Sequence, residues 1–299
     1  MSDVPALGLL LDVDGPVASP VTRSIAIPSI ATDIVALANA GVPVVFNTGR
    51  SDQFLKDEVV GPLVEGGLLP HARVFGVCEK GGSWFRITPT GAGDLSIDES
   101  LFPYPDLVTA VDDLVTERFA DTVFFDRTKR TMIAVEQRLD VASDDYLAQQ
   151  SVIDRAVIDL CTESGLGTMW RNERHPAPDG SISIRLDPSI ISTDIESVRV
   201  GKDFGAERAL TLVAASGPVP AVWRTMGDSR VDYAMADWLH AADYEIAHVD
   251  VRPADGVPEK PYPVLTAAAA LTNDAAGAVF LRRWASRIVE GTAPDDHPA

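Results

Sequence analysis

The sequence predicts an α/β fold with a doubly wound, Rossmann-like parallel sheet, into which a separate α+β unit is inserted. Three observations favour this fold. Apolar strand-like segments alternate with helical patterns near both ends of the chain, which is typical of a parallel sheet covered by helices. The middle of the chain, from about 105 to 187, follows an αββαββ order instead. With 299 residues, 46% of them hydrophobic, the chain can fill the cores of two domains.

The first part of the chain builds βαβ units. Ile30, Ile34, Leu37 and Ala38 recur at helical spacing and would share one face of a helix that ends at Gly41. The elements expected here are strands at 7–12, 42–46, 73–78 and 84–87, with helical segments before 42 and after 51. This alternation predicts a parallel sheet layer.

The middle of the chain changes pattern. A helix is expected from 105, because Leu107, Val111 and Leu114 fall on one face. The other elements expected here are a helix at 144–163 and strands at 122–126, 131–136, 168–171 and 181–186. This order is typical of helices on one face of an antiparallel sheet. We expect the inserted unit to span 87–195 and the core to be formed by 1–86 and 196–299.

Alternation returns in the last third of the chain. The elements expected here are helices at 202–215, 230–239 and 275–289 and strands at 221–226 and 244–249. The segment 252–263 is rich in proline, and we expect a surface excursion that covers the edge of the sheet. Residues 292–299 are expected to be disordered.

Composition limits the classes of partner. A formal net charge of -19 argues against nucleic acid or an anionic membrane surface, because no basic patch offsets it. Cys78 and Cys161 are too few for a disulfide framework or a metal cluster, so we expect two small buried hydrophobes in a reducing compartment. The sequence shows no segment typical of a membrane span or a signal peptide, and a cytoplasmic protein is expected.

Polar side chains follow the ends of several expected strands. Asp12 and Asp14 come directly after the first strand, Thr48 follows the second, and Asp228 follows the strand at 221–226. In an open parallel sheet, ligands bind at the carboxyl ends of the strands, near the point where the strand order reverses. Segments far apart in the sequence are therefore predicted to bring these side chains into one crevice.

The residue types in this crevice suit phosphoryl transfer. One carboxylate of the pair Asp12 and Asp14 can attack phosphorus while the other handles protons. Attack by an anion requires its repulsion with the phosphate to be removed, which hard oxygen ligands achieve by holding Mg²⁺. Asp228 supplies further oxygen, and Thr48 and Lys202 can donate to the transferring oxygens. The sequence therefore predicts a magnesium-dependent phosphoryl-transfer site.

Four motifs in order give this chain a family resemblance. Asp12–Gly15, Thr48–Arg50, Lys202 and Gly227–Asp232 match the four motifs of the haloacid dehalogenase (HAD) superfamily, so the chain resembles a HAD phosphatase. The inserted αββαββ unit lies between the second and third motifs, which resembles the C2-type cap of the type IIB, Cof-like branch. The turn Glu79–Gly82 is similar to the turn that precedes that cap. The resemblance implies a HAD core with an inserted cap.

The resemblance also implies roles for the carboxylates. Asp12 would be the nucleophile that forms an aspartyl-phosphate, and Asp14 would be the general acid and then the general base. Mg²⁺ would be held by Asp12, by the backbone carbonyl of Asp14 and by Asp228.

The remaining motif residues would bind phosphate or support the site. By the same resemblance, Thr48, Gly49 and Lys202 would bind the phosphoryl group. Asp232, with Ser229, would orient the metal ligands or Lys202 without binding the metal directly.

Two positions depart from the family pattern. Pro16 stands where relatives usually have Thr, which removes a hydroxyl and a backbone N–H from the first motif. Val231 stands where the type IIB pattern often has Asn before the last Asp.

Five basic residues are candidates for reading the substrate. Arg50 lies in the second motif, Arg127 and Lys129 lie between two expected strands of the cap, and Arg171 and Arg174 follow another. A basic hairpin tip is commonly just solvated, so these residues are the weaker part of the predicted site.

These observations predict a magnesium-dependent hydrolase of a small phosphomonoester, most simply a sugar phosphate. A phosphomutase with the same aspartyl-phosphate is the alternative among enzymes. A ligand-binding protein on a phosphatase scaffold is the alternative outside them. Product analysis separates the first two, and tight binding without turnover would indicate the third.

Overall fold

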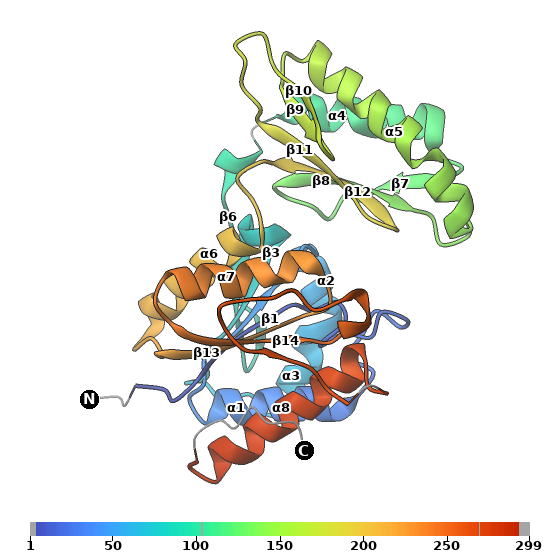
Figure 1. The fold of residues 1–299 in the computed structure, drawn as a ribbon. Helices are drawn as coiled ribbons and strands as arrows, with labels where there is room; N and C mark the ends of the chain where they lie inside the picture. Colours follow the sequence, from blue (N-terminus) through green and yellow to red (C-terminus); the bar gives the residue numbers. More distant parts are fainter. Residues whose placement is uncertain (1–3, 103, 269, 293–299) are drawn as a thin grey trace. The chain divides into compact units, whose positions relative to one another are not determined.

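The computed structural model describes residues 4–102, 104–268 and 270–292, and the chain divides into two compact units (Figure 1). The core unit comprises Met1–Ser96 and Gly201–Ala299, and the cap unit comprises Ile97–Val200. The cap therefore begins at Ile97 rather than at 87 and ends at Val200 rather than at 195. The reason for the later start lies in strand pairing, because residues 91–92 and the short strand that begins at Ser96 pair with the core strand at 83–88.

The core sheet has nine strands, with six parallel strands in the order β15-β14-β13-β1-β2-β3 followed by β4 and β5. The parallel strands are β1 (Gly8–Leu11), β2 (Val44–Asn47), β3 (Val74–Cys78), β13 (Val222–Gly227), β14 (Glu245–Asp250) and β15 (Val264–Leu265). The edge beyond β3 is formed by β4 (Ser83–Thr88), β5 (Gly91–Ala92) and β6 (Ser96–Ile97). The chain moves outward from β1 in both directions, so the order reverses between β1 and β13, where ligands bind in such sheets.

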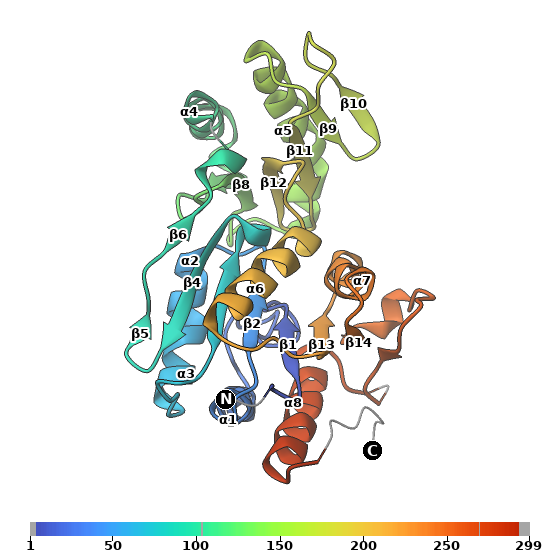
Figure 2. The ribbon, with the colours of Figure 1, turned by 90° about the vertical axis from the view of Figure 1, so that its left-hand side faces the viewer.

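Helices cover both faces of this sheet (Figure 2). Leu9 and Leu11 pack in one apolar cluster and Leu10 packs in another, because successive side chains of a strand point to opposite faces. The first cluster includes the helices α1 (Pro28–Asn39) and α8 (Asn273–Val289), and the second includes α6 (Lys202–Ser216) and α7 (Tyr233–Ala241). The short helices α2 (Asp52–Leu55) and α3 (Gly61–Glu65) are joined by a π-helical turn, Lys56–Val60.

The cap unit is a six-stranded sheet with two long helices on one face. The strand order is β10-β9-β11-β12-β8-β7, antiparallel except for the pair β9 and β11. The elements are α4 (Pro105–Leu114), β7 (Val123–Phe125), β8 (Met132–Gln137), α5 (Ser143–Glu163), β9 (Thr168–Trp170), β10 (Glu173–His175), β11 (Ile184–Pro188) and β12 (Ser192–Ser197). Both helices contribute to one apolar cluster with the strands.

The predicted fold class is confirmed, with corrections inside the cap. The sequence predicted four cap strands, whereas the structure adds β10 and β12. Both were missed because their side chains are largely polar: β10 is an exposed edge strand, and β12 reads STDIES.

The structure bears on several smaller predictions from the sequence. The segment 252–263 leads from β14 to the edge strand β15 through a short 3₁₀ turn, Pro253–Asp255. Residues 293–299 of the expected disordered tail lie outside the described residues. Cys78 and Cys161 are both buried free thiols, as predicted. Among the described helices, none combines the length and apolar character needed to cross a bilayer.

One glycine fixes how the last helix meets the first motif. A Cβ atom at Gly277, in α8, would lie 2.0 Å from the carbonyl oxygen of Pro16. Replacing Gly by Ala inside a helix usually stabilises it by about 1 kcal/mol. Here we expect Gly277→Ala to lower the free energy of unfolding by about 1–3 kcal/mol, because backbone has to move. Urea unfolding measures the change, and a stabilised variant would contradict the close packing of α8 on this loop.

A buried histidine makes core stability depend on pH. His248 in β14 is fully buried, its Nδ1 lies 2.7 Å from the Thr225 hydroxyl, and its ring lies 4.2 Å from that of Tyr233. Burial lowers the pKa of His248 to about 4. The unfolded imidazole takes up a proton near its ordinary pKa of about 6.5 and the folded one does not, so stability present above that value is lost as the pH falls.

We expect roughly 3 kcal/mol of unfolding free energy to be lost through this group between pH 6.5 and 4. The measurement is urea unfolding of the wild type and of His248→Asn at several pH values. The difference between the two proteins isolates the imidazole from the carboxylates, which titrate in both. Parallel stability curves for the two proteins would show that His248 is not the responsible group.

Candidate active site

The candidate site lies where the strand order of the core sheet reverses. β1 and β13 are neighbours in register, and the Asp12 N–H donates to the Met226 carbonyl at 2.8 Å. The loops after these two strands therefore start side by side. Gly15 has a φ of 90°, and a Cβ there would lie 2.6 Å from Cβ of Asp228. Glycine after Asp-x-Asp thus permits both the turn and the close approach of Asp228.

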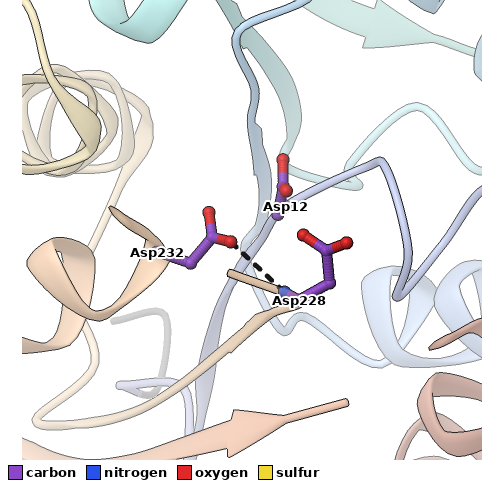
Figure 3. Close-up of side chains that lie close together, drawn as sticks. All are labelled: Asp12, Asp228 and Asp232. Atoms are coloured by element: carbon purple, nitrogen blue, oxygen red, sulfur yellow. Dashed lines mark hydrogen bonds between the residues drawn. The ribbon is translucent and has the colours of Figure 1, made fainter. Parts of the chain in front are cut away.

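Three carboxylates converge at this point (Figure 3). Asp12, Asp228 and Asp232 each offer an oxygen, and these atoms all lie within 4.8 Å of one another. Asp12 and Asp232 are buried, and Asp228 is partly exposed. Three negative charges this close require compensation by cations and hydrogen-bond donors.

Lys202 supplies one positive charge between two of the carboxylates. Its Nζ lies 2.6 Å from Asp12 Oδ1 and 2.7 Å from Asp232 Oδ1, and it donates to the Asn47 carbonyl at 2.8 Å. Lys202 is the first residue of α6, so the helix carries the ammonium to the ends of β1 and β2.

Asn47 is a site residue that the sequence did not reveal. Its Nδ2 donates to the Lys202 carbonyl at 2.8 Å, while its own carbonyl accepts from Lys202 Nζ. These reciprocal bonds hold the start of α6 against the end of β2. A Cβ at Gly205 would lie 2.0 Å from Asn47 Oδ1, so a glycine in α6 makes this approach possible. The available signal was a polar residue ending the buried strand 44–47.

Asp232 uses its two carboxylate oxygens differently. Oδ2 accepts from the Ser229 hydroxyl at 2.7 Å and from the backbone N–H groups of Ser229 and Asp228 at 3.0 and 3.2 Å. Oδ1 forms the ion pair with Lys202. A Cβ at Gly227 would lie 2.2 Å from that of Asp232, so only glycine fits before Asp228. Asp232 therefore shapes the 228–232 turn and fixes Lys202 at the same time.

The two carboxylates that share Lys202 are not equivalent. Burial and the neighbouring charge of Asp232 raise the pKa of Asp12 well above its ordinary value, although Lys202 opposes this. Burial acts the same way on Asp232, but Lys202 and Ser229 outweigh it and lower its pKa. Burial also disfavours the charge on Lys202, yet its two partners raise its pKa. The charge on Asp12 is thus the less compensated of the two.

Asp228 also carries an incompletely compensated charge. Burial, and then the charge of Asp232, raise the pKa of Asp228 to about 6, while Arg252 and Lys202 oppose the shift. Arg252 Nη1 lies 3.4 Å from Asp228 Oδ2. Arg252 was not predicted from the sequence, because it follows β14 without a motif around it.

Asp14 is held apart from the three converging carboxylates. Arg50 Nε lies 2.9 Å from Asp14 Oδ2 and its Nη2 lies 3.0 Å from Oδ1, a two-pronged pair that orients the carboxylate. The guanidinium also lies 4.8 Å from the ring centre of Phe54. Arg50 therefore binds the predicted acid/base residue, a contact that the sequence did not predict.

The Thr48 hydroxyl and Gly49 lie in the turn after β2. Thr48 is fully buried, and its Oγ1 accepts from the Arg50 N–H at 3.1 Å, which leaves the hydroxyl proton available as a donor. The Lys80 N–H donates to the Thr48 carbonyl at 2.9 Å, and a Cβ at Gly49 would lie 3.6 Å from Lys80 Cε. The turn is thus fixed by the segment that follows β3.

The cap places only two of its four candidate residues at one cavity. Arg127 and Lys129 line a cavity of about 590 Å³ between α4 and the β7–β8 hairpin. Arg127 is also paired with Asp112 at 2.7 Å. Arg171 lies with its guanidinium 5.2 Å from the ring centre of Trp170, and Arg174 lies on the exposed strand β10. Neither of these lines the cavity.

Comparison with known proteins shows a shared fold at low sequence identity. No family model matches the sequence, and no curated protein is significantly similar to it. A solved trehalose-6-phosphate phosphatase related protein is 12% identical over 95% of this chain and 100% of its own, with a TM-score of 0.59. The C-terminal domain of the trehalose-6-phosphate phosphatase of C. albicans is 14% identical over 87% of this chain and 88% of its own, with a TM-score of 0.58.

A third solved structure carries the name of the superfamily. A haloacid dehalogenase-like hydrolase from Bacteroides thetaiotaomicron is 9% identical over 87% of this chain and 93% of its own, with a TM-score of 0.52. These matches extend over both the core and the cap, because they cover most of each chain. The protein thus shares the fold of these three solved structures, a Rossmann-like core with an inserted α+β cap.

Proposed function

We propose that this protein is a magnesium-dependent phosphatase that hydrolyses a small phosphomonoester through an aspartyl-phosphate on Asp12. One observation carries the proposal: Asp12, Asp228 and Asp232 converge where the strand order of the core sheet reverses, and Lys202 pairs with Asp12 and Asp232. The fold shared with solved phosphatases supports the same reaction class. We also propose that the substrate is a phosphorylated sugar or a related metabolite, since two of these structures are named for trehalose-6-phosphate phosphatase.

The residues present fit a divalent cation. Asp12 and Asp228 offer oxygen atoms within 4.8 Å of each other, and their pKa values are raised by burial and then by the charge of Asp232, which Lys202 only partly offsets. Oxygen ligands with surplus negative charge are what Mg²⁺ prefers. Asp232 is engaged with Lys202 and with its own turn, so Asp12, Asp228 and the carbonyl of Asp14 are the proposed ligands. When bound, the cation supplies positive charge that lowers the repulsion between Asp12 and the phosphate.

The side chains divide the chemistry between them. Asp12 attacks phosphorus, and its bond to phosphorus forms as the bond to the leaving oxygen breaks. Lys202, the Thr48 hydroxyl and the Gly49 N–H donate to the phosphoryl oxygens as charge develops. Asp14 gives a proton to the leaving oxygen and then takes one from the water that hydrolyses the aspartyl-phosphate.

Arg50 positions the acid/base residue before and after these steps. Its two-pronged contact holds the Asp14 carboxylate in one orientation.

The first experiment tests the nucleophile and the metal together. Phosphate release from a panel of sugar and cofactor phosphates is measured with Mg²⁺ or with EDTA, for the wild type and for Asp12→Asn. We expect release only with Mg²⁺, and a loss of more than about 10³-fold in kcat in the variant, because an amide cannot attack phosphorus.

Asp243→Asn is the matched control, because Asp243 is exposed and has a φ of 63°, which asparagine adopts equally well. It should retain wild-type turnover. Release that survives in Asp12→Asn would refute the assigned nucleophile. An isomeric sugar phosphate formed without free phosphate would indicate a mutase instead, and tight binding without either product would indicate a ligand-binding protein.

A second experiment tests the role of Asp14. With p-nitrophenyl phosphate, whose leaving group needs no proton, Asp14→Asn should still form the aspartyl-phosphate but hydrolyse it about 10²–10⁴-fold more slowly. When the phosphate of the substrate carries a radioactive label, the variant should therefore accumulate labelled protein after acid quenching, and hydroxylamine should release that label. A burst of p-nitrophenolate should accompany it. Equal slowing of both steps, with no labelled protein, would show that Asp14 serves binding and not proton transfer.

A further inference from the structure

The loop after β14 sends one arginine to the proposed metal ligand Asp228. Arg252 Nη1 lies 3.4 Å from Asp228 Oδ2, and Nη2 of the same guanidinium lies 2.9 Å from Asp255 Oδ2. A guanidinium carries its donors on separate nitrogen atoms, so it can bind two carboxylates at once. Arg252 is thus shared between one carboxylate in the candidate site and one outside it.

The backbone beneath Arg252 is held firmly. Its N–H donates to Asp250 Oδ1 at 2.8 Å, and Asp250 Oδ2 accepts from the Tyr233 hydroxyl at 2.6 Å. The preceding N–H, of Val251, donates to the Gly227 carbonyl at 3.0 Å. The arginine therefore starts from a fixed point beside the turn that carries Asp228.

The head of the side chain is much less constrained than its base. The Arg252 side chain is 44% exposed and that of Asp255 is 58% exposed, whereas that of Asp228 is only 18% exposed. The guanidinium can therefore leave Asp228 and stay paired with the exposed Asp255. Exposed ion pairs of this kind are weak enough to exchange partners.

We propose that Arg252 competes with the divalent cation for Asp228, and that Asp255 limits this competition by drawing the guanidinium away. The inference rests on the proposed function, because it takes Asp228 as a metal ligand. Both cations would draw on the one carboxylate of Asp228, and their charges would repel each other when they lie close together. The affinity of the site for the divalent cation is then set in part by Arg252, which is not itself a metal ligand.

Substitutions of Arg252 and of Asp255 should change the affinity for Mg²⁺ in opposite directions. Arg252→Gln removes the competitor, so the protein should bind Mg²⁺ more tightly. Asp255→Asn removes the alternative partner, so Arg252 should stay on Asp228 and Mg²⁺ should bind more weakly. From the usual strength of half-exposed ion pairs, we expect changes of about two- to fivefold in each direction. Isothermal titration with MgCl₂, without any phosphorylated compound, measures the dissociation constants.

Matched variants separate competition from net charge. Arg118→Gln removes the same charge from an exposed position in the cap unit. Glu259→Gln removes the same charge as Asp255→Asn from an exposed position in the same segment. Both controls should bind Mg²⁺ as the wild type does, within about 1.5-fold. Unfolding midpoints in EDTA show whether each variant is folded.

Every outcome bears on the proposal. Tighter binding in Arg252→Gln with weaker binding in Asp255→Asn, and unchanged controls, would support it. Equal effects in Arg252→Gln and Arg118→Gln would overturn it in favour of net charge, and weaker binding in Arg252→Gln would show that Arg252 orients Asp228 for the metal. Equal affinities in all proteins would overturn the inference alone, whereas a wild type that binds no Mg²⁺ would overturn it together with the metal-dependent function.

Discussion

The interaction on which the candidate site depends is the buried contact of Lys202 with Asp12 and Asp232. It joins the ends of three segments far apart in the sequence, β1, the start of α6 and the turn after β13. Two buried carboxylates cannot both be ionised without a cation between them, and a buried ammonium needs both of them in turn. Breaking any one partner leaves an uncompensated charge, so the geometry of these three segments is specified together.

Backbone proximity makes this convergence possible. Gly15, Gly205 and Gly227 each lie where a Cβ would overlap a side chain of the site, namely that of Asp228, Asn47 and Asp232. From the sequence alone, such glycines indicate only a turn or a weakened helix. The structure shows instead that they let charged loops approach a neighbouring strand or helix. The close packing of the site therefore depends on these three glycines as well as on the carboxylates.

The sequence predicts the parts of this molecule that follow from local pattern. These parts include the alternating strands and helices of the core and the positions of Asp12, Thr48 and Asp228 at strand ends. The strand order reverses between β1 and β13, so the strand ends that carry Asp12 and Asp228 lie next to each other. Contacts that depend on tertiary approach were missed. The contact of Arg50 with Asp14 is one of these, because nothing in the spacing of the two residues reveals a contact across two loops. The strand β12 was missed because its polar composition conceals a buried central strand.

On the proposed function, the overall acidity of the chain and the charge of its substrate are compatible for a physical reason. The net charge of -19 is spread over the whole chain, and charges beyond about 8 Å are largely screened at physiological ionic strength. Within that range of the bound phosphate, the local groups dominate: Lys202, the Thr48 hydroxyl and the cation held by the carboxylates. An acidic surface then lowers the rate of encounter with an anion more than it lowers the strength of its binding. Selection of the substrate is left to close contacts, for which buried donors in fixed positions are better suited than long-range attraction.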